Sequence, residues 1–265
     1  MPFTLSHPAA IIPLHKLLGR RVSISAMVIG SMSPDFAYFL PGVSGLMTHS
    51  LRGIFSFCLP AGLLMYFIFH LLVKRPASLL LPGPVLARLR NTAFGAPGLP
   101  ATSVWVLACS VMLGAATHIG WDAFTHRSSA IVSHFEIFRI VVFNSGGYIL
   151  YLYKLLQHLS TAFGLLVLAW WIKSWLDATP AVAEAQLLED AEQPGLEGRA
   201  RAYIVGGIVA VSALCGGSAG IMRAGLPLER WLFHVVVAGL SGAALALLFY
   251  CLAWAAVGAG RRRNA

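Results

Sequence analysis

Five long apolar segments constrain the fold of this chain more than any other feature of its sequence. A helix needs about 20 predominantly apolar residues to cross the hydrocarbon core of a bilayer. Five segments come near that length, at roughly residues 54–73, 103–121, 159–175, 202–222 and 231–257. We therefore expect an all-α fold, a polytopic membrane helix bundle with about five transmembrane helices.

The composition agrees with a membrane location. Only 11% of the 265 residues are charged, against about 25% in soluble domains. The net charge of +9 could suggest a nucleic-acid partner, but the basic residues flank apolar segments, as Lys74, Arg75 and Lys173 do, and form no dense patch. Such flanking is typical of anchoring at lipid headgroups. We predict a multi-pass protein of the cell (inner or plasma) membrane that contacts lipid and binds no nucleic acid.

The chain is short enough for one integral membrane domain, residues 1–265. Within it, residues 1–165 carry the motifs, and residues 202–257 form two C-terminal spans. The stretch 177–198 is rich in acidic residues and poor in aromatic ones, which predicts a flexible, solvated loop. A further apolar piece, residues 22–32, is too short to span. We expect it to be an N-terminal helical segment that lies at the interface or packs against the bundle.

The stretch GAATHIGWDAFTH, residues 114–126, places potential metal ligands at the end of the second span. His118, Asp122 and His126 are spaced four apart, and residues i and i+4 of an α-helix lie on the same side. His118 and Asp122 can thus reach one cation, and His126 can join them only if the helix continues. Imidazole and carboxylate suit zinc and related divalent ions. The alternative is that His118 and Asp122 merely pair and cap the helix end.

Further candidate ligands come to the same membrane face when the chain is followed through its spans. They are His7, Asp35, His49 and His158. Each has a structural interpretation when taken alone: Asp35 follows a proline and could be a helix cap, and His158 could be an interfacial residue. Their joint occurrence at one face favours a site.

The same residues carry a resemblance to a known family. Five ordered blocks between residues 2 and 165 are similar to the bacterial membrane family called domain of unknown function 4184. The blocks are PFTLSHPAAIIPL, SAMVIGSMSPDF, THSLRGIFSF, HIGWDAFTH and LLQHLSTAFGLL. That family is more distantly similar to membrane-bound metal-dependent hydrolases, and to the group of zinc-dependent phospholipase C and the single-strand-specific nucleases.

The resemblance implies metal-binding roles for five residues and suggests a sixth. The five are His7, Asp35, His49, His118 and Asp122, and His158 falls where the soluble enzymes need a later histidine. The glutamate that often follows such a histidine by four residues is replaced here by Ala162. This departure favours one or two ions over a cluster of three.

Together these features favour a membrane-embedded metal-dependent hydrolase, with zinc as the expected ion. A phosphoester such as a phospholipid or a lipid-linked phosphate would suit a site at headgroup depth. Asp35 could bridge two ions or act as general base, and Arg52 and Arg127 could clamp a phosphate. The alternative is a non-enzymatic protein, either an ion or proton pathway or a metal-stabilised bundle. A transporter would more often place its polar residues at mid-depth.

Overall fold

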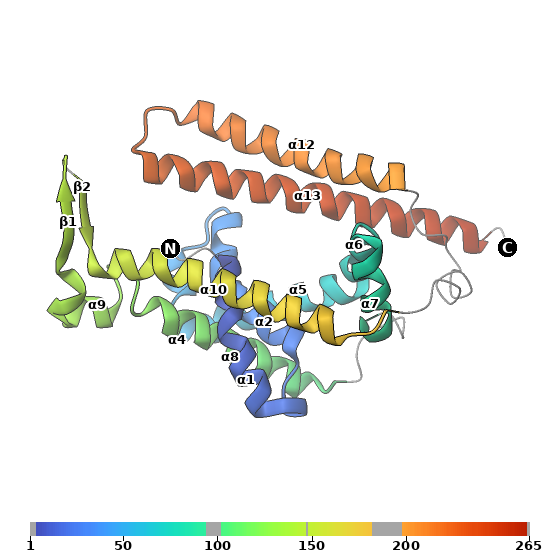
Figure 1. The fold of residues 1–265 in the computed structure, drawn as a ribbon, viewed down its shortest axis with the longest axis horizontal. Coiled ribbons are helices and arrows are strands. Elements are labelled where there is room, and N and C mark those ends of the chain that lie inside the picture. The colour runs from blue at the N-terminus through green and yellow to red at the C-terminus, as the bar shows by residue number, and fades with distance from the viewer. Residues whose placement is uncertain (1–3, 94–101, 147, 182–197, 264–265) are drawn as a thin grey trace. The chain divides into compact units, whose positions relative to one another are not determined.

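A computed structural model of the chain describes residues 4–93, 102–146, 148–181 and 198–263 (Figure 1). These residues are almost entirely helical, and their one sheet has two strands. Five of the described helices are long and apolar enough to cross a membrane. They are Leu51–Leu79, α8 (Val104–Asp122), α10 (Leu152–Ala178), α12 (Gly198–Met222) and the stretch Leu228–Gly258 of α13 (Leu228–Arg263). The predicted all-α, multi-pass membrane fold is confirmed.

Short helices make up most of the remaining chain. Before the first span come the 3-10 helix η1 (Thr4–Ala10), α1 (Ile11–Leu18), η2 (Gly19–Arg21), α2 (Ile24–Met32), the 3-10 helix η3 (Ser33–Phe39) and α3 (Gly45–Thr48). The first span itself comprises α4 (Leu51–Gly53), η4 (Ile54–Cys58), α5 (Leu59–Ile68), η5 (Phe69–Val73) and α6 (Lys74–Leu79). Three further short helices are α7 (Gly83–Ala93), α9 (Ala130–His134) and η6 (Glu136–Arg139).

Two features differ from the sequence-based expectation. The third span begins at Leu152, not near residue 159, because Gln157 and His158 continue the helix instead of preceding it. The connection before it contains an antiparallel hairpin of β1 (Val141–Ser145) and β2 (Tyr148–Tyr151), which the sequence did not predict. Most of the predicted acidic loop, at 182–197, lies outside the described residues.

The contacts within the chain divide it into two compact units. Unit 1 comprises Met1–Tyr66 and Pro100–Trp175, and unit 2 comprises Phe67–Leu99 and Leu176–Ala265. In unit 2, α12 and α13 pack along each other, and each donates a side-chain hydrogen bond to a glycine carbonyl of the other: Ser212 Oγ to Gly239, and Trp231 Nε1 to Gly220.

In unit 1 the segment predicted at residues 22–32 is helix α2, and it packs against the bundle. Gly30 and Gly114 make this crossing possible. A Cβ on Gly30 would lie 2.2 Å from the carbonyl oxygen of Val111, and one on Gly114 would lie 2.1 Å from that of Met27. The backbones of α2 and α8 therefore touch, which small residues allow between membrane helices. This close crossing fixes the buried end of α8 against the N-terminal segments.

Candidate metal centre

The C-terminal end of α8 carries two of the polar residues on its buried face. The buried residues of α8 recur at helical spacing, and the last two are His118 and Asp122. The full set is Leu107, Ser110, Val111, Gly114, Ala115, His118 and Asp122. Because residues four apart lie on one side of a helix, the stripe that packs against α2 and η1 also carries both side chains inward. As predicted, His118 and Asp122 lie on the same face of the helix.

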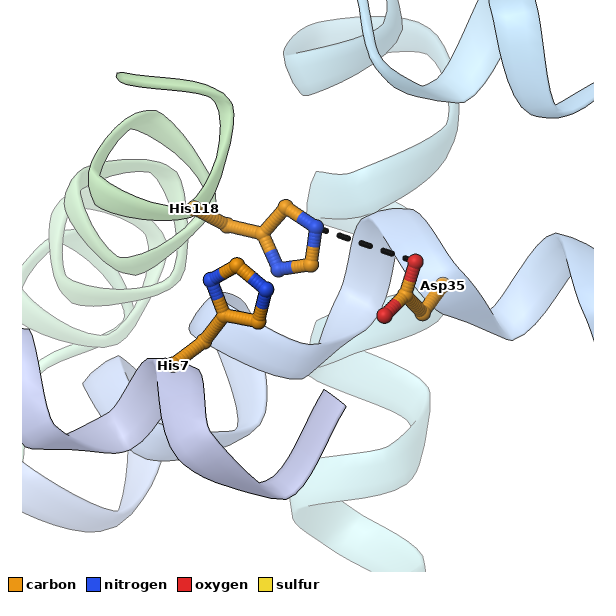
Figure 2. Close-up of side chains that lie close together, drawn as sticks. All are labelled: His7, Asp35 and His118. Atoms are coloured by element: carbon orange, nitrogen blue, oxygen red, sulfur yellow. Dashed lines mark ion pairs between the residues drawn. The ribbon is translucent and has the colours of Figure 1, made fainter. Parts of the chain in front are cut away.

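Three N-terminal segments bring the other residues to the same place. His7 comes from η1, Asp35 from η3, and His49 from the residue that follows α3. His7, Asp35 and His118 are each no more than 1% exposed, and Asp122 is 5% exposed. Figure 2 shows His7 and His118 stacked beside each other, with Asp35 facing the ring of His118. Buried ionisable groups need a compensating partner, and here they face one another.

Backbone carbonyls fix the tautomer of two of the imidazoles. His118 Nδ1 lies 2.6 Å from the carbonyl oxygen of Ser31, and His49 Nδ1 lies 2.8 Å from that of Gly45. A carbonyl can only accept a hydrogen bond, so each Nδ1 must carry the proton and donate it. In the neutral rings each Nε2 therefore presents a lone pair. The two Nε2 atoms are 3.3 Å apart, and two facing lone pairs repel each other unless a metal ion or a proton lies between them.

Carboxylate oxygens complete this arrangement. Asp35 Oδ1 is 3.2 Å from His49 Nε2 and 3.7 Å from His118 Nε2. Asp122 Oδ2 is 3.6 Å and 3.3 Å from the same two atoms. Ligand atoms bound at about 2.0–2.1 Å around a tetrahedral zinc ion lie about 3.3 Å from one another. The two nitrogens and either oxygen thus form a triangle of the size that such an ion requires.

His7 adds a third imidazole that has no hydrogen-bond partner. Both of its ring nitrogens are buried without one, and its Nε2 lies 3.6 Å from Asp122 Oδ1. Burial, together with the neighbouring His118, lowers the pKa of His7 to about 3. The ring is therefore neutral near pH 7, which is the form that binds a metal. A buried polar group left unpaired in this way needs an explanation, and an ion beside it would supply one.

His126 also reaches the site, although α8 ends at Asp122. The next residues keep a helical turn, since the backbone N–H of His126 donates to the carbonyl of Asp122. This turn brings His126 Nδ1 to 3.5 Å from Asp122 Oδ1. Burial is the main cause that lowers the pKa of His126, so this ring too is held towards the neutral form. The sequence allowed His126 to join the other two residues only if the helix continued, and the chain does continue for one helical turn.

Two supporting contacts were not visible in the sequence. Thr4 Oγ1 donates to Asp35 Oδ2 at 2.6 Å, which leaves Oδ1 to face the imidazoles. The Ser31 carbonyl orients His118. Partners of this kind fix the direction of metal ligands in proteins. Neither could be inferred from spacing, because a threonine and a main-chain carbonyl carry no sequence signal of their own.

Three predicted residues are not members of this cluster. His158 is an exposed residue of α10, and its neighbour Gln157 is the buried one. Arg52 and Arg127 are exposed, and within the described chain neither forms an ion pair with a carboxylate. The cluster therefore consists of His7, Asp35, His49, His118, Asp122 and His126.

The cluster is enclosed but not sealed. The side chain of His49 is 17% exposed and that of His126 is 24% exposed, and their ring centroids are 6.5 Å apart. Part of each of these two side chains is therefore accessible, whereas His7, Asp35 and His118 are buried. A saturated structural metal site needs no accessible side, whereas a catalytic site keeps one position open.

Comparison with known proteins gives a family but no function. A family model described as "Domain of unknown function (DUF4184)" matches residues 1–252. No curated protein and no solved structure matches the chain.

Proposed function

The chain belongs to the DUF4184 family, and from the site itself we propose that it is a membrane-embedded metal-dependent hydrolase. It would hold one or two divalent ions, with zinc favoured by the nitrogen and carboxylate donors. One ion would be bound by His49 Nε2 and His118 Nε2 together with Asp35 or Asp122. His7 and Asp122 Oδ1 offer donors for a second.

The observation that carries this proposal is the pair of facing Nε2 atoms, 3.3 Å apart. Each ring donates a hydrogen bond from its Nδ1 to a backbone carbonyl. Hydrogen bonding between the two neutral rings is excluded, since neither Nε2 has a proton to give. A bound cation turns this repulsive arrangement into a favourable one, and carbonyl-oriented imidazoles are usual for metal ligands.

Different residues around the ion would bind it and accept a proton during hydrolysis. A bound divalent ion lowers the pKa of water and stabilises charge on a phosphoryl oxygen. Asp35, whose Oδ2 accepts a hydrogen bond from Thr4, would serve as a ligand through Oδ1. Asp122 would bind through Oδ2, and in a site with one ion its Oδ1, which has no hydrogen-bond partner, would be available to accept a proton.

A phosphoester at headgroup depth, such as a phospholipid or a lipid-linked phosphate, is the proposed substrate. His118 and Asp122 lie at the last turns of a membrane-spanning helix, so the site is near one end of the span. Arg52 and Arg127 remain candidates to bind a phosphate, because both side chains are exposed and unpaired with acid. A planar guanidinium binds phosphate oxygens in pairs.

The first test is elemental analysis of the purified protein in detergent. The wild type should carry at least about one zinc or manganese ion per chain, and His118→Ala/Asp122→Ala should carry almost none. His134→Ala is the matched control, because His134 is an exposed histidine outside the cluster, and it should retain the wild-type content. Wild-type protein that stays metal-free after incubation with zinc and manganese would overturn the proposal.

Hydrolysis is tested separately, by measuring the cleavage of a phosphoester. Metal-loaded wild type should cleave a chromogenic phosphodiester or a phospholipid, and the double variant should lose at least 100-fold of that activity. Stoichiometric metal without turnover of any phosphoester would leave the metal centre in place and refute the hydrolase.

A further inference from the structure

The hairpin of β1 and β2 exposes apolar side chains on both of its faces. Phe143 pairs with Leu150, and Asn144 pairs with Ile149. Neighbouring residues of a strand point to opposite faces, so Phe143 and Ile149 lie on different faces. They are 53% and 44% exposed. Every residue of β1 is exposed.

The apolar surface extends into the chain that precedes the strands. Three large apolar side chains there are exposed, namely Phe135, Ile137 and Ile140, and so are Val141 and Val142 at the start of β1. Soluble monomers rarely expose a contiguous apolar patch of more than a few hundred Å², and a lone two-stranded hairpin is marginally stable in water. A hairpin of this composition requires an apolar environment.

The position of the hairpin indicates what that environment is. The hairpin lies between the end of α8 and the start of α10, so it is on the side of the membrane where α8 ends and α10 begins. Figure 1 shows the hairpin standing across the end of α10 instead of continuing along it. A segment that runs across the end of a membrane-spanning helix lies along the bilayer surface.

The flanking residues suit that depth. Tyr151 and Tyr153 stack with their ring centroids 5.8 Å apart, directly at the junction of β2 and α10. Tyrosine is enriched where a protein passes from hydrocarbon to headgroups. Arg139 and Lys154 flank the hairpin on its two sides, and long basic side chains can bury their stems while their charges reach the headgroups.

We propose that the hairpin Val141–Tyr151 inserts its apolar side chains into the interface of the same bilayer that the helices cross. This anchors the connection between α8 and α10 beside the ligand-bearing end of α8. The proposal does not depend on a bound metal or on hydrolysis.

Spin labels on the full-length protein test this placement. Phe143→Cys and Ile149→Cys would each be made with the two exposed cysteines replaced (Cys109→Ser and Cys215→Ser), while Cys58 and Cys251 are fully buried and escape labelling. The labelled proteins are reconstituted in phosphatidylcholine/phosphatidylglycerol vesicles. Both labels should collide more with oxygen, which concentrates in lipid, than with a water-soluble nickel chelate.

A label at Leu166→Cys gives the matched lipid reference, because Leu166 is 69% exposed within the span α10. Val142→Cys provides a third hairpin position should either variant fail to fold. Labels that collide more with the nickel chelate than with oxygen would place the hairpin in water and overturn the proposal. Spectral broadening that disappears on dilution with unlabelled protein would show that a second copy covers the hairpin, which also overturns it.

Discussion

At the scale of single residues, the direction in which a side chain points decides more about the candidate site than its presence does. Asp35 has two oxygens in different situations: Oδ2 accepts from Thr4 Oγ1 at 2.6 Å, while Oδ1 is buried without a hydrogen bond. The threonine therefore decides which oxygen faces His49 and His118. A hydroxyl that orients a ligand in this way commonly changes metal affinity by about 10–100-fold when it is removed.

Substituting Thr4 tests this directly. Thr4→Val keeps the shape of the side chain but removes the donor, so Asp35 can rotate and one buried oxygen loses its partner. We expect zinc affinity, measured by competition with a chelating dye, to fall by about 10-fold or more. Thr4→Ser restores the hydroxyl and should stay within about threefold of wild type. Equal affinities in the valine and serine variants would show that Thr4 plays no part in orienting Asp35.

The sequence predicted which residues would cluster better than it predicted their surroundings. His118 and Asp122 follow from a four-residue spacing that any α-helix converts into proximity. The sequence did not show that His158 is exposed outside the cluster, because an apolar span does not reveal which of its sides packs against the protein. Thr4 and the Ser31 carbonyl depend on the tertiary path of η1 and α2, which local pattern does not encode.

At the scale of elements, the site depends on how closely α2 and α8 approach. A Cβ at position 114 would lie 2.1 Å from the Met27 carbonyl oxygen and 2.7 Å from the backbone nitrogen of Ser31. The same Ser31 orients His118 through its carbonyl. One backbone contact thus supports both the packing of two helices and the direction of a ligand.

Gly114→Ala should therefore impair stability and metal binding together. Overpacking of this kind typically costs about 1–3 kcal/mol, so we expect a lower thermal midpoint in detergent and weaker zinc binding. Gly120→Ala, on the same helix with open space around its Cβ, is the matched control. It should match or slightly exceed wild-type stability, because alanine favours a helix. A Gly114→Ala protein as stable as this control would contradict the close crossing.

Element boundaries were predicted where hydropathy changes sharply and were missed where it does not. All five spans are present, but α10 starts seven residues earlier than the polar pair Gln157 and His158 suggested. Polar residues at a membrane edge do not end a helix, since they still form its backbone hydrogen bonds. The hairpin was missed because Val141, Val142 and Phe143 are all apolar and lack the alternation that signals a strand.

At the scale of the whole molecule, the candidate site belongs to one of the two units. Each residue of the cluster falls within Met1–Tyr66 or Pro100–Trp175. Helices α12 and α13 belong to unit 2 and are packed through glycines: a Cβ on Gly216 would lie 3.1 Å from the carbonyl oxygen of Val235. Stability and metal binding should therefore be separable by substitutions in different units.

Gly216→Leu tests that separation. A leucine there must push α12 and α13 apart, and overpacking should cost about 1–3 kcal/mol and lower the thermal midpoint. Metal content should stay at the wild-type value, because α12 and α13 supply no ligand. Gly217→Leu, at the next position with open space around its Cβ, adds the same side chain without the clash and should leave both quantities unchanged. Loss of metal in Gly216→Leu while the protein remains folded would mean that the centre depends on unit 2 after all.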